Sequence, residues 1–200
     1  SHFGVITGPC HAEEVALERL SYLTIASRNL NITSKMKEKL NCSYIQSSIS
    51  QDVIGLEYAA TLKNIYSIAV GIANGLGYGD NFVSVLVTNA IREMKLFLNQ
   101  IDNTIRSVDT SPYLGDLLVT SYSGFSRNRM LGNMIGKGYR VKAALIEMKM
   151  VAEGYYGSKT VNELCNSFTG EYPILKSVYQ VLYESKSAKK KMRSLSKLLF

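Results

Sequence analysis

The chain has 200 residues, of which 46% are apolar and 20% charged. This ordinary globular composition excludes a disordered, collagenous or fibrous protein, and the length allows a core that needs no disulfide or structural metal. The three cysteines, Cys10, Cys42 and Cys165, lie far apart without a Cys-x-x-Cys pair. That spacing excludes a zinc finger and favours a reducing compartment, so we expect no metal site.

The net charge of +7 is concentrated at the end of the chain. Six basic residues and no acidic ones lie within the last fifteen positions: Lys186, Lys189, Lys190, Lys191, Arg193 and Lys197. The remainder is nearly neutral, which weakens electrostatic steering, and we expect no nucleic-acid partner. Apolar residues Met192, Leu195, Leu198 and Leu199 share one helical face of this tail. The pattern favours docking on the chain's own helices over a membrane-surface or partner-binding helix.

The opening residues have neither the basic head nor the apolar run of a signal peptide, so we expect a cytoplasmic protein. The longest apolar stretch, 53–73, is interrupted by Glu57, Lys63, Asn64 and Ser67. It is therefore predicted to be a buried helix, and we expect no integral membrane segment.

The first part of the chain alternates strand and helix patterns. Residues 3–7, 22–26 and 44–48 are rich in β-branched and aromatic side chains, and stretches such as 12–20 repeat apolar residues at helical spacing. This is a βαβαβ fragment suited to the edge of an α/β sheet.

From residue 51 onward, helical patterns follow one another and no period-two run is found. The expected helices are 56–73, 82–98, 127–135, 141–148, 158–168 and 174–184. The fold class is therefore mainly α, with residues 1–51 forming a short α/β part and residues 52–200 an all-helical domain.

Lys63 is the one charged residue among the twenty-two that separate Glu57 from Asp80. An ammonium group in so apolar a helix is costly to desolvate, an environment that favours a role in proton transfer. The alternative is a lysine at the bundle edge whose amine reaches water.

The glycine-rich run 75–81 does not fit a dinucleotide-binding turn, because the required third glycine falls on Asp80 and the run follows a helix. It is better explained as the end of one helix and the start of the next, with Asp80 or Asn81 as the cap.

Ser126, Arg127, Asn128 and Arg129 open a predicted helix, so a serine cap, free backbone N–H groups and guanidinium groups gather at one N-terminus. This combination suits a phosphate, although an ordinary surface helix with solvated arginines fits as well. Asp116 and Thr120, one helical turn apart, could face the same space.

These segments together resemble the C-terminal part of the bacterial-type NAD(P)-dependent glycerol-3-phosphate dehydrogenases. The matching runs are Thr7-Gly8-Pro9-Cys10-His11-Ala12, Leu62-Lys63-Asn64-Ile65, Gly75-Leu76-Gly77-Tyr78-Gly79, Gly115-Asp116-Leu117-Leu118-Val119-Thr120, Ser126-Arg127-Asn128-Arg129 and Val151-Ala152-Glu153-Gly154. The resemblance implies the end of a Rossmann-type sheet followed by a helical substrate domain like the C-terminal domain of 6-phosphogluconate dehydrogenase.

The resemblance also implies roles for particular residues. Lys63 would be the catalytic acid–base group in reversible hydride transfer between sn-glycerol 3-phosphate and dihydroxyacetone phosphate, a step in glycerophospholipid synthesis. The residues related to substrate binding are Gly8, Cys10, Lys63, Asn64, Asp116, Thr120, Ser126, Arg127 and Asn128, with Arg127 and Asn128 nearest the phosphate. Those related to the NAD or NADP cofactor are Ala12, Arg127, Val151 and Glu153, and a homodimer is possible.

The chain departs from the family in two ways. Cys10-His11 stands where the family usually has a serine or threonine followed by an aromatic residue, which puts a hydroxyl contact in doubt. No Gly-x-Gly-x-x-Gly follows a strand, so we expect the main cofactor-binding half upstream of Ser1 and an inactive fragment without it. Two alternatives remain: a related hydroxyacid dehydrogenase with another substrate, and a non-catalytic basic helical binding module.

Overall fold

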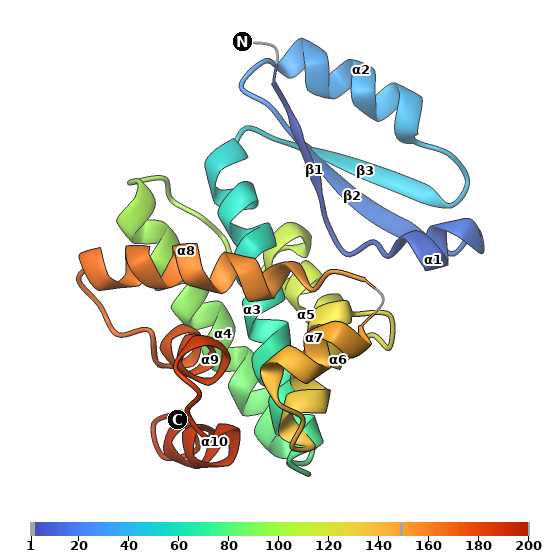
Figure 1. Cartoon of the computed structure of the whole chain (residues 1–200). Coiled ribbons are helices and arrows are strands. Elements are labelled where there is room, and N and C mark those ends of the chain that lie inside the picture. Colours follow the sequence, from blue (N-terminus) through green and yellow to red (C-terminus); the bar gives the residue numbers. More distant parts are fainter. Residues whose placement is uncertain (1–2, 149, 200) are drawn as a thin grey trace.

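The computed structural model describes residues 3–148 and 150–199. A small sheet and its helices lie at one end of the molecule, and a larger group of helices forms the rest (Figure 1). The expectation of a mainly helical fold preceded by a short α/β part is confirmed. The division into two domains at residues 51 and 52 stays a prediction.

The sheet consists of β1 (Val5–Thr7), β2 (Ser21–Ala26) and β3 (Ile45–Ser50) in that order. Strands β2 and β3 are parallel, because α2 (Leu30–Leu40) crosses between them and packs against both. Strands β1 and β2 are antiparallel, which departs from a simple βαβαβ pattern. The helix between them, α1 (Ala12–Ala16), is short and buries none of its residues, so it does not serve as a crossover that covers the sheet.

The helices that follow β3 are arranged around α3 (Val53–Gly75), which runs through the middle of the group (Figure 1). Every residue from Ile65 to Ala73 is buried, as expected for a helix that is apolar on all sides. The others are α4 (Asp80–Ile101), a π-helical turn η1 (Ser111–Gly115), α5 (Asp116–Tyr122), α6 (Arg127–Gly136), α7 (Val141–Glu147), α8 (Glu153–Ser167), α9 (Pro173–Tyr183) and α10 (Ala188–Leu195). Helix α5 and the turn before it were not among the predicted helices.

Helices α3 and α6 cross at glycines. A Cβ atom on Gly71 would overlap the carbonyl oxygen of Arg129, and one on Gly132 would overlap that of Ile68. Gly75 and Gly136 make the same kind of contact four residues further along each helix. The two backbones can therefore touch, which brings the first turn of α6 beside the middle of α3.

Two polar anchors hold the helical part together. The Asp52 carboxylate caps α3 through the Gly55 N–H (2.9 Å) and accepts hydrogen bonds from Arg106 Nε (2.6 Å) and from the Tyr113 hydroxyl. The hydrogen bonds from Arg106 and Tyr113 outweigh desolvation and lower the pKa of Asp52. This cluster ties the segment before η1 to the start of α3.

Glu93 is the second anchor. Its side chain, 4% exposed on α4, accepts hydrogen bonds from the N–H groups of Ile174 (3.0 Å) and Leu175 (2.9 Å) in the first turn of α9. Burial raises the pKa of Glu93 to about 8, against the opposing effect of these two bonds. Helix α9 thus takes its N-terminal cap from another helix.

The run 75–81 ends α3 and starts α4, as predicted, but the cap is Gly79 and α4 begins at Asp80. The prediction of Asp80 or Asn81 as the cap is wrong, because Gly79 already has the extended backbone of a capping residue. Within residues 3–148 and 150–199, no helix is both long and apolar enough to cross a membrane.

The basic tail docks on its own helices through Met192, Leu195 and Leu199, which are 0–5% exposed. Leu198, expected on the same face, is 63% exposed because α10 ends at Leu195 and the helical spacing is lost after it. Phe200, the last residue of that predicted tail, lies outside the described residues.

Candidate functional site

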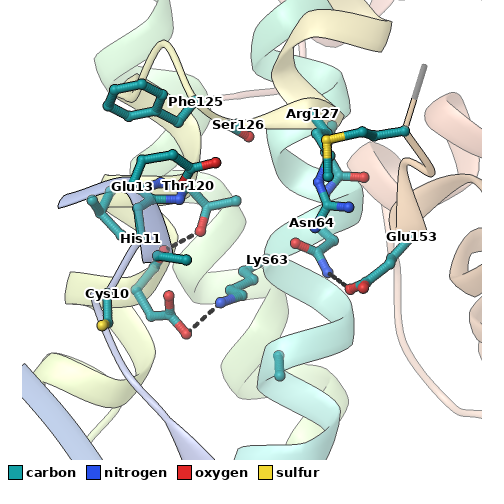
Figure 2. A pocket seen from close by; sticks show the side chains of 16 residues that line it. Cys10, His11, Glu13, Lys63, Asn64, Thr120, Phe125, Ser126, Arg127 and Glu153 are labelled. Atoms are coloured by element: carbon teal, nitrogen blue, oxygen red, sulfur yellow. Dashed lines mark hydrogen bonds and ion pairs between the residues drawn. The ribbon is translucent and has the colours of Figure 1, made fainter. Parts of the chain in front are cut away.

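A cavity of about 420 Å³ lies where α3, α5, α6 and α8 meet the segment that follows β1. Its walls combine charged, polar and apolar side chains (Figure 2). They are Cys10, His11, Ala12, Glu13, Ala60, Lys63, Asn64, Asp116, Val119, Thr120, Phe125, Ser126, Arg127, Asn128, Met150 and Glu153.

Lys63 and Asn64 are neighbours on α3 that point to different sides of the cavity (Figure 2). The Lys63 amine forms an ion pair with the Asp116 carboxylate, at 2.6 Å between Nζ and Oδ2. The side chain of Lys63 is 20% exposed and that of Asp116 is 2% exposed. The ammonium group is therefore neither isolated in an apolar helix nor directed into bulk water, because a carboxylate at the start of α5 holds it at the cavity wall.

Asp116 is held from the sheet side as well. The Thr7 hydroxyl at the end of β1 donates to Asp116 Oδ2 (3.1 Å), and the Gly8 N–H also bonds the carboxylate. Burial raises the pKa of Asp116, although Lys63, Thr7 and Gly8 all act in the opposite direction. Asp116 thus links the sheet, α5 and α3 at one point and fixes the position of the Lys63 amine.

The N-terminus of α6 forms another part of the cavity wall. Ser126 is the N-cap, and its hydroxyl accepts a hydrogen bond from the Arg129 N–H (3.3 Å). The Ser67 hydroxyl on α3 lies 3.0 Å from that of Ser126 and donates to the Thr120 carbonyl oxygen (2.7 Å). These bonds fix the helix end whose free N–H groups and Arg127 guanidinium lie beside the cavity, an arrangement that attracts anions.

Helix α8 reaches the site through its first turn. Asn64 Nδ2 donates to Glu153 Oε2 (3.3 Å), and the Gly154 N–H donates to Asn128 Oδ1 (2.9 Å). A Cβ atom on Gly154 would lie 2.7 Å from the Asn64 carbonyl oxygen, so the helices meet at backbone contact. The side-chain oxygen of Asn128 is thereby used to hold α8.

Most of the residues singled out in the sequence lie at this cavity. Gly8 and Val151 do not line it. The Gly8 N–H bonds the Asp116 carboxylate, and Val151 is 56% exposed. Gly8 has φ +137° and its Cβ would lie 2.7 Å from the Tyr22 carbonyl oxygen, so glycine is required at this turn. Arg129 lies in the same turn as Arg127 but does not line the cavity.

Several lining residues were not assigned from the sequence, among them Glu13, Phe125 and Met150. The rings of His11 and Phe125 are 6.2 Å apart. No local pattern marks Phe125 or Met150, because they reach the cavity from loops placed by tertiary packing. Burial raises the pKa of the Cys10 thiol, which favours its protonated form. Among the described residues, no group of histidine, cysteine and acidic side chains could hold a metal ion.

A group of helices lies against a small α/β sheet, and an ammonium group and a helix N-terminus face the same cavity. This arrangement defines the class of site that can hold an anionic substrate and transfer a proton to it.

Residues 52–193 match the family model described as the C-terminus of NAD-dependent glycerol-3-phosphate dehydrogenase. The chain belongs to this family. It is 37% identical over 192 residues to the glycerol-3-phosphate dehydrogenase [NAD(P)+] of an Exiguobacterium species, and 35% identical over 192 residues to that of Staphylococcus epidermidis. These alignments cover 96% of the chain but 56% and 58% of the relatives, so the chain spans somewhat more than half of their length.

Solved structures give the same result. The chain superposes on glycerol-3-phosphate dehydrogenase from Coxiella burnetii with a TM-score of 0.92 at 30% identity, covering 96% of this chain and 59% of that one. A structure from Dunaliella salina gives a TM-score of 0.87 at 25% identity and covers 95% and 34% respectively.

Proposed function

We propose that this chain carries the substrate site and the proton-transfer residue of an NAD(P)-dependent glycerol-3-phosphate dehydrogenase. The reaction is reversible hydride transfer between sn-glycerol 3-phosphate and dihydroxyacetone phosphate, serving glycerophospholipid synthesis. The observation that carries the proposal is the Lys63–Asp116 pair at 2.6 Å in the same cavity as the N-terminus of α6. The names of the relatives support the same activity.

Two parts of the site bind the two ends of the substrate. The phosphate lies at the start of α6, where backbone N–H groups and the Arg127 guanidinium donate hydrogen bonds. The hydroxyl or carbonyl oxygen at C2 faces the Lys63 amine. In the reductive direction the Lys63 ammonium donates a proton to that oxygen as negative charge develops on it, and in the oxidative direction the amine takes the proton back.

The residues related to the cofactor fit the reactive end of a nicotinamide. Ala12, Arg127 and Glu153 line the cavity, and Ala12 and Glu153 are exposed. The Glu153 carboxylate can accept a hydrogen bond from the carboxamide, while Val151 lies outside the cavity wall. When bound, NAD or NADP would accept the hydride in its oxidised form and donate it in its reduced form. A cytoplasmic location and a homodimer stay predictions.

Direct titration of the 200-residue chain with glycerol 3-phosphate tests the substrate site. We expect binding of glycerol 3-phosphate and much weaker binding of glycerol, because the helix N-terminus recognises the phosphate. Arg127→Gln should weaken binding about tenfold, since it removes a charge-assisted contact. The matched control is Arg92→Gln, an exposed arginine on α4. Equal affinity for glycerol, or no loss in Arg127→Gln, would contradict the phosphate site.

A further inference from the structure

A second cavity, of about 610 Å³, lies between the end of α6, the start of α7, the first turn of α8 and the end of α9. It shares no lining residue with the candidate active site. Its volume is within the range of small-molecule sites, which span roughly 300–1,000 Å³. Helices α9 and α10 lie at the end of the molecule away from the sheet (Figure 1).

The inner part of this cavity is apolar. Ile135, Val181 and Leu182, each at most 6% exposed, contribute to its lining. The rings of Tyr155 and Tyr183 stack with centroids 4.9 Å apart and form part of the wall. The Tyr183 hydroxyl donates to the Tyr155 carbonyl oxygen (2.7 Å), so its polar end is satisfied within the protein and both rings are held in place. This wall suits an aliphatic group.

The mouth of the cavity is basic. Arg140, Lys142 and Lys186 line it and are all exposed, and no carboxylate is found among the described residues that line it. These cations come from two separate segments, one before and within α7 and one after α9, so they do not form a single solvated helix face.

Two turns bring these segments together. Gly138, at φ +100°, ends α6 while the Tyr139 N–H bonds the Met134 carbonyl oxygen (3.1 Å), and this turn leads into Arg140. Ser185, at φ +55°, follows α9, and the next N–H, that of Lys186, bonds the Gln180 carbonyl oxygen (3.1 Å). The chain thus adopts a left-handed conformation at a non-glycine residue directly before Lys186. Lys186 lines the same cavity as Arg140 and Lys142.

We propose that this cavity is a second ligand site, for an amphipathic anion of the alkyl phosphate class. The aliphatic chain lies against the apolar inner wall, and the phosphate lies among the three cations at the mouth. Three cations match a phosphate dianion better than a single carboxylate, since each can donate a charge-assisted hydrogen bond. The proposal is independent of the reaction at the first cavity.

Calorimetric titration of the 200-residue chain with octyl phosphate, kept below its micelle concentration, tests the site. We expect saturable binding of octyl phosphate, and at least about tenfold weaker binding of inorganic phosphate and of neutral octyl glucoside, because each lacks one half of the ligand. Lys142→Gln combined with Lys186→Gln should weaken octyl phosphate binding about tenfold, because it removes two of the three cations and leaves an uncharged polar side chain at each position. Lys159→Gln combined with Lys190→Gln, two exposed lysines outside the cavity, is the matched control.

Two further measurements distinguish this cavity from the first. The Lys142→Gln/Lys186→Gln variant should bind glycerol 3-phosphate as the parent does, and Arg127→Gln should bind octyl phosphate as the parent does. Absence of octyl phosphate binding, equal loss in the control pair, or loss caused by Arg127→Gln alone would overturn the proposal. Equally tight binding of inorganic phosphate would also overturn it, because the apolar wall would then contribute nothing.

Discussion

At the scale of single residues, buried acids couple the fold to pH. Glu93 ordinarily titrates near 4.5, but burial raises its pKa to about 8 in the folded chain. Between these two values the folded state retains a proton that the unfolded state has lost. Stability arising from this group is therefore complete below about pH 4.5 and declines as the pH rises towards 8.

Replacing Glu93 by glutamine should remove this dependence. We expect the parent to lose stability across this interval by up to about 1.4 kcal/mol per pH unit from this group, and Glu93→Gln to show a flatter profile. Urea unfolding at a series of pH values measures both profiles. Glu147→Gln, at an exposed position on α7, is the control, and identical slopes in all three proteins would refute the role of Glu93.

The contribution of Asp52 to stability changes with pH in the opposite direction to that of Glu93. Hydrogen bonds from Arg106 and Tyr113 lower its pKa in the folded chain, so its contribution is present above the unfolded pKa and disappears as the pH falls through the folded value. Asp52→Asn should destabilise the chain at neutral pH by about 3 kcal/mol, since it leaves the buried Arg106 with a single carboxylate partner. Thermal unfolding compares Asp52→Asn with Asp109→Asn, a control at an exposed position. Equal stability of the two variants would contradict the role of Asp52 as an anchor.

At the scale of elements, the glycine crossing of α3 and α6 positions the N-terminus of α6, where we propose that the phosphate binds. Gly132→Ala would drive a methyl group into the Ile68 carbonyl oxygen. We expect a loss of roughly 2–4 kcal/mol of stability, or a displacement of α6 that also weakens glycerol 3-phosphate binding, because the backbones cannot approach as closely. Gly79→Ala has open space around the added carbon and an ordinary φ of −82°, so it should cost no more than the about 1 kcal/mol expected for alanine at a helix N-cap.

The elements also show how much of the fold can be predicted from the sequence. The long helices were predictable because their apolar spacing persists over many residues, and the Ser126 cap because it begins such a helix. Helix α5 was not predicted, since it has only seven residues and three of its four buried residues, Asp116, Thr120 and Ser121, are polar, so no apolar spacing marks it. Strand β1 is antiparallel to β2 because of the way the chain packs after Gly8. No local sequence pattern predicts that packing.

The same limit applies to the site. Lys63 stood out because it is the single charge in an apolar segment, but its partner Asp116 lies 53 positions further along the chain. The resemblance to a known family connected the two residues, whereas spacing alone left Lys63 with either a catalytic or a solvated role. Phe125 and Met150 line the cavity from loops and carry no signal in the sequence.

At the scale of the whole molecule, the sheet and the helices share the site. Thr7 of β1 and Gly8 directly after it bond the Asp116 carboxylate, Asp116 holds Lys63 of α3, and α6 and α8 complete the cavity. Lys63, the proposed proton-transfer residue, and the N-terminus of α6 are thus positioned by elements far apart in the chain. The activity assigned to the cavity depends on this assembly remaining intact.

The most direct test of that activity is the rate of dihydroxyacetone phosphate reduction, with and without Lys63, measured in the longer protein that we expect to contain this chain. Lys63→Met should lower turnover by about a hundredfold to ten-thousandfold because the proton donor is lost, while Lys95→Met, an exposed lysine on α4, should leave it unchanged. Thermal unfolding and glycerol 3-phosphate titration of the same variants establish that each remains folded and able to bind. A folded Lys63→Met protein that turns over substrate at the parental rate would contradict the proton-transfer role.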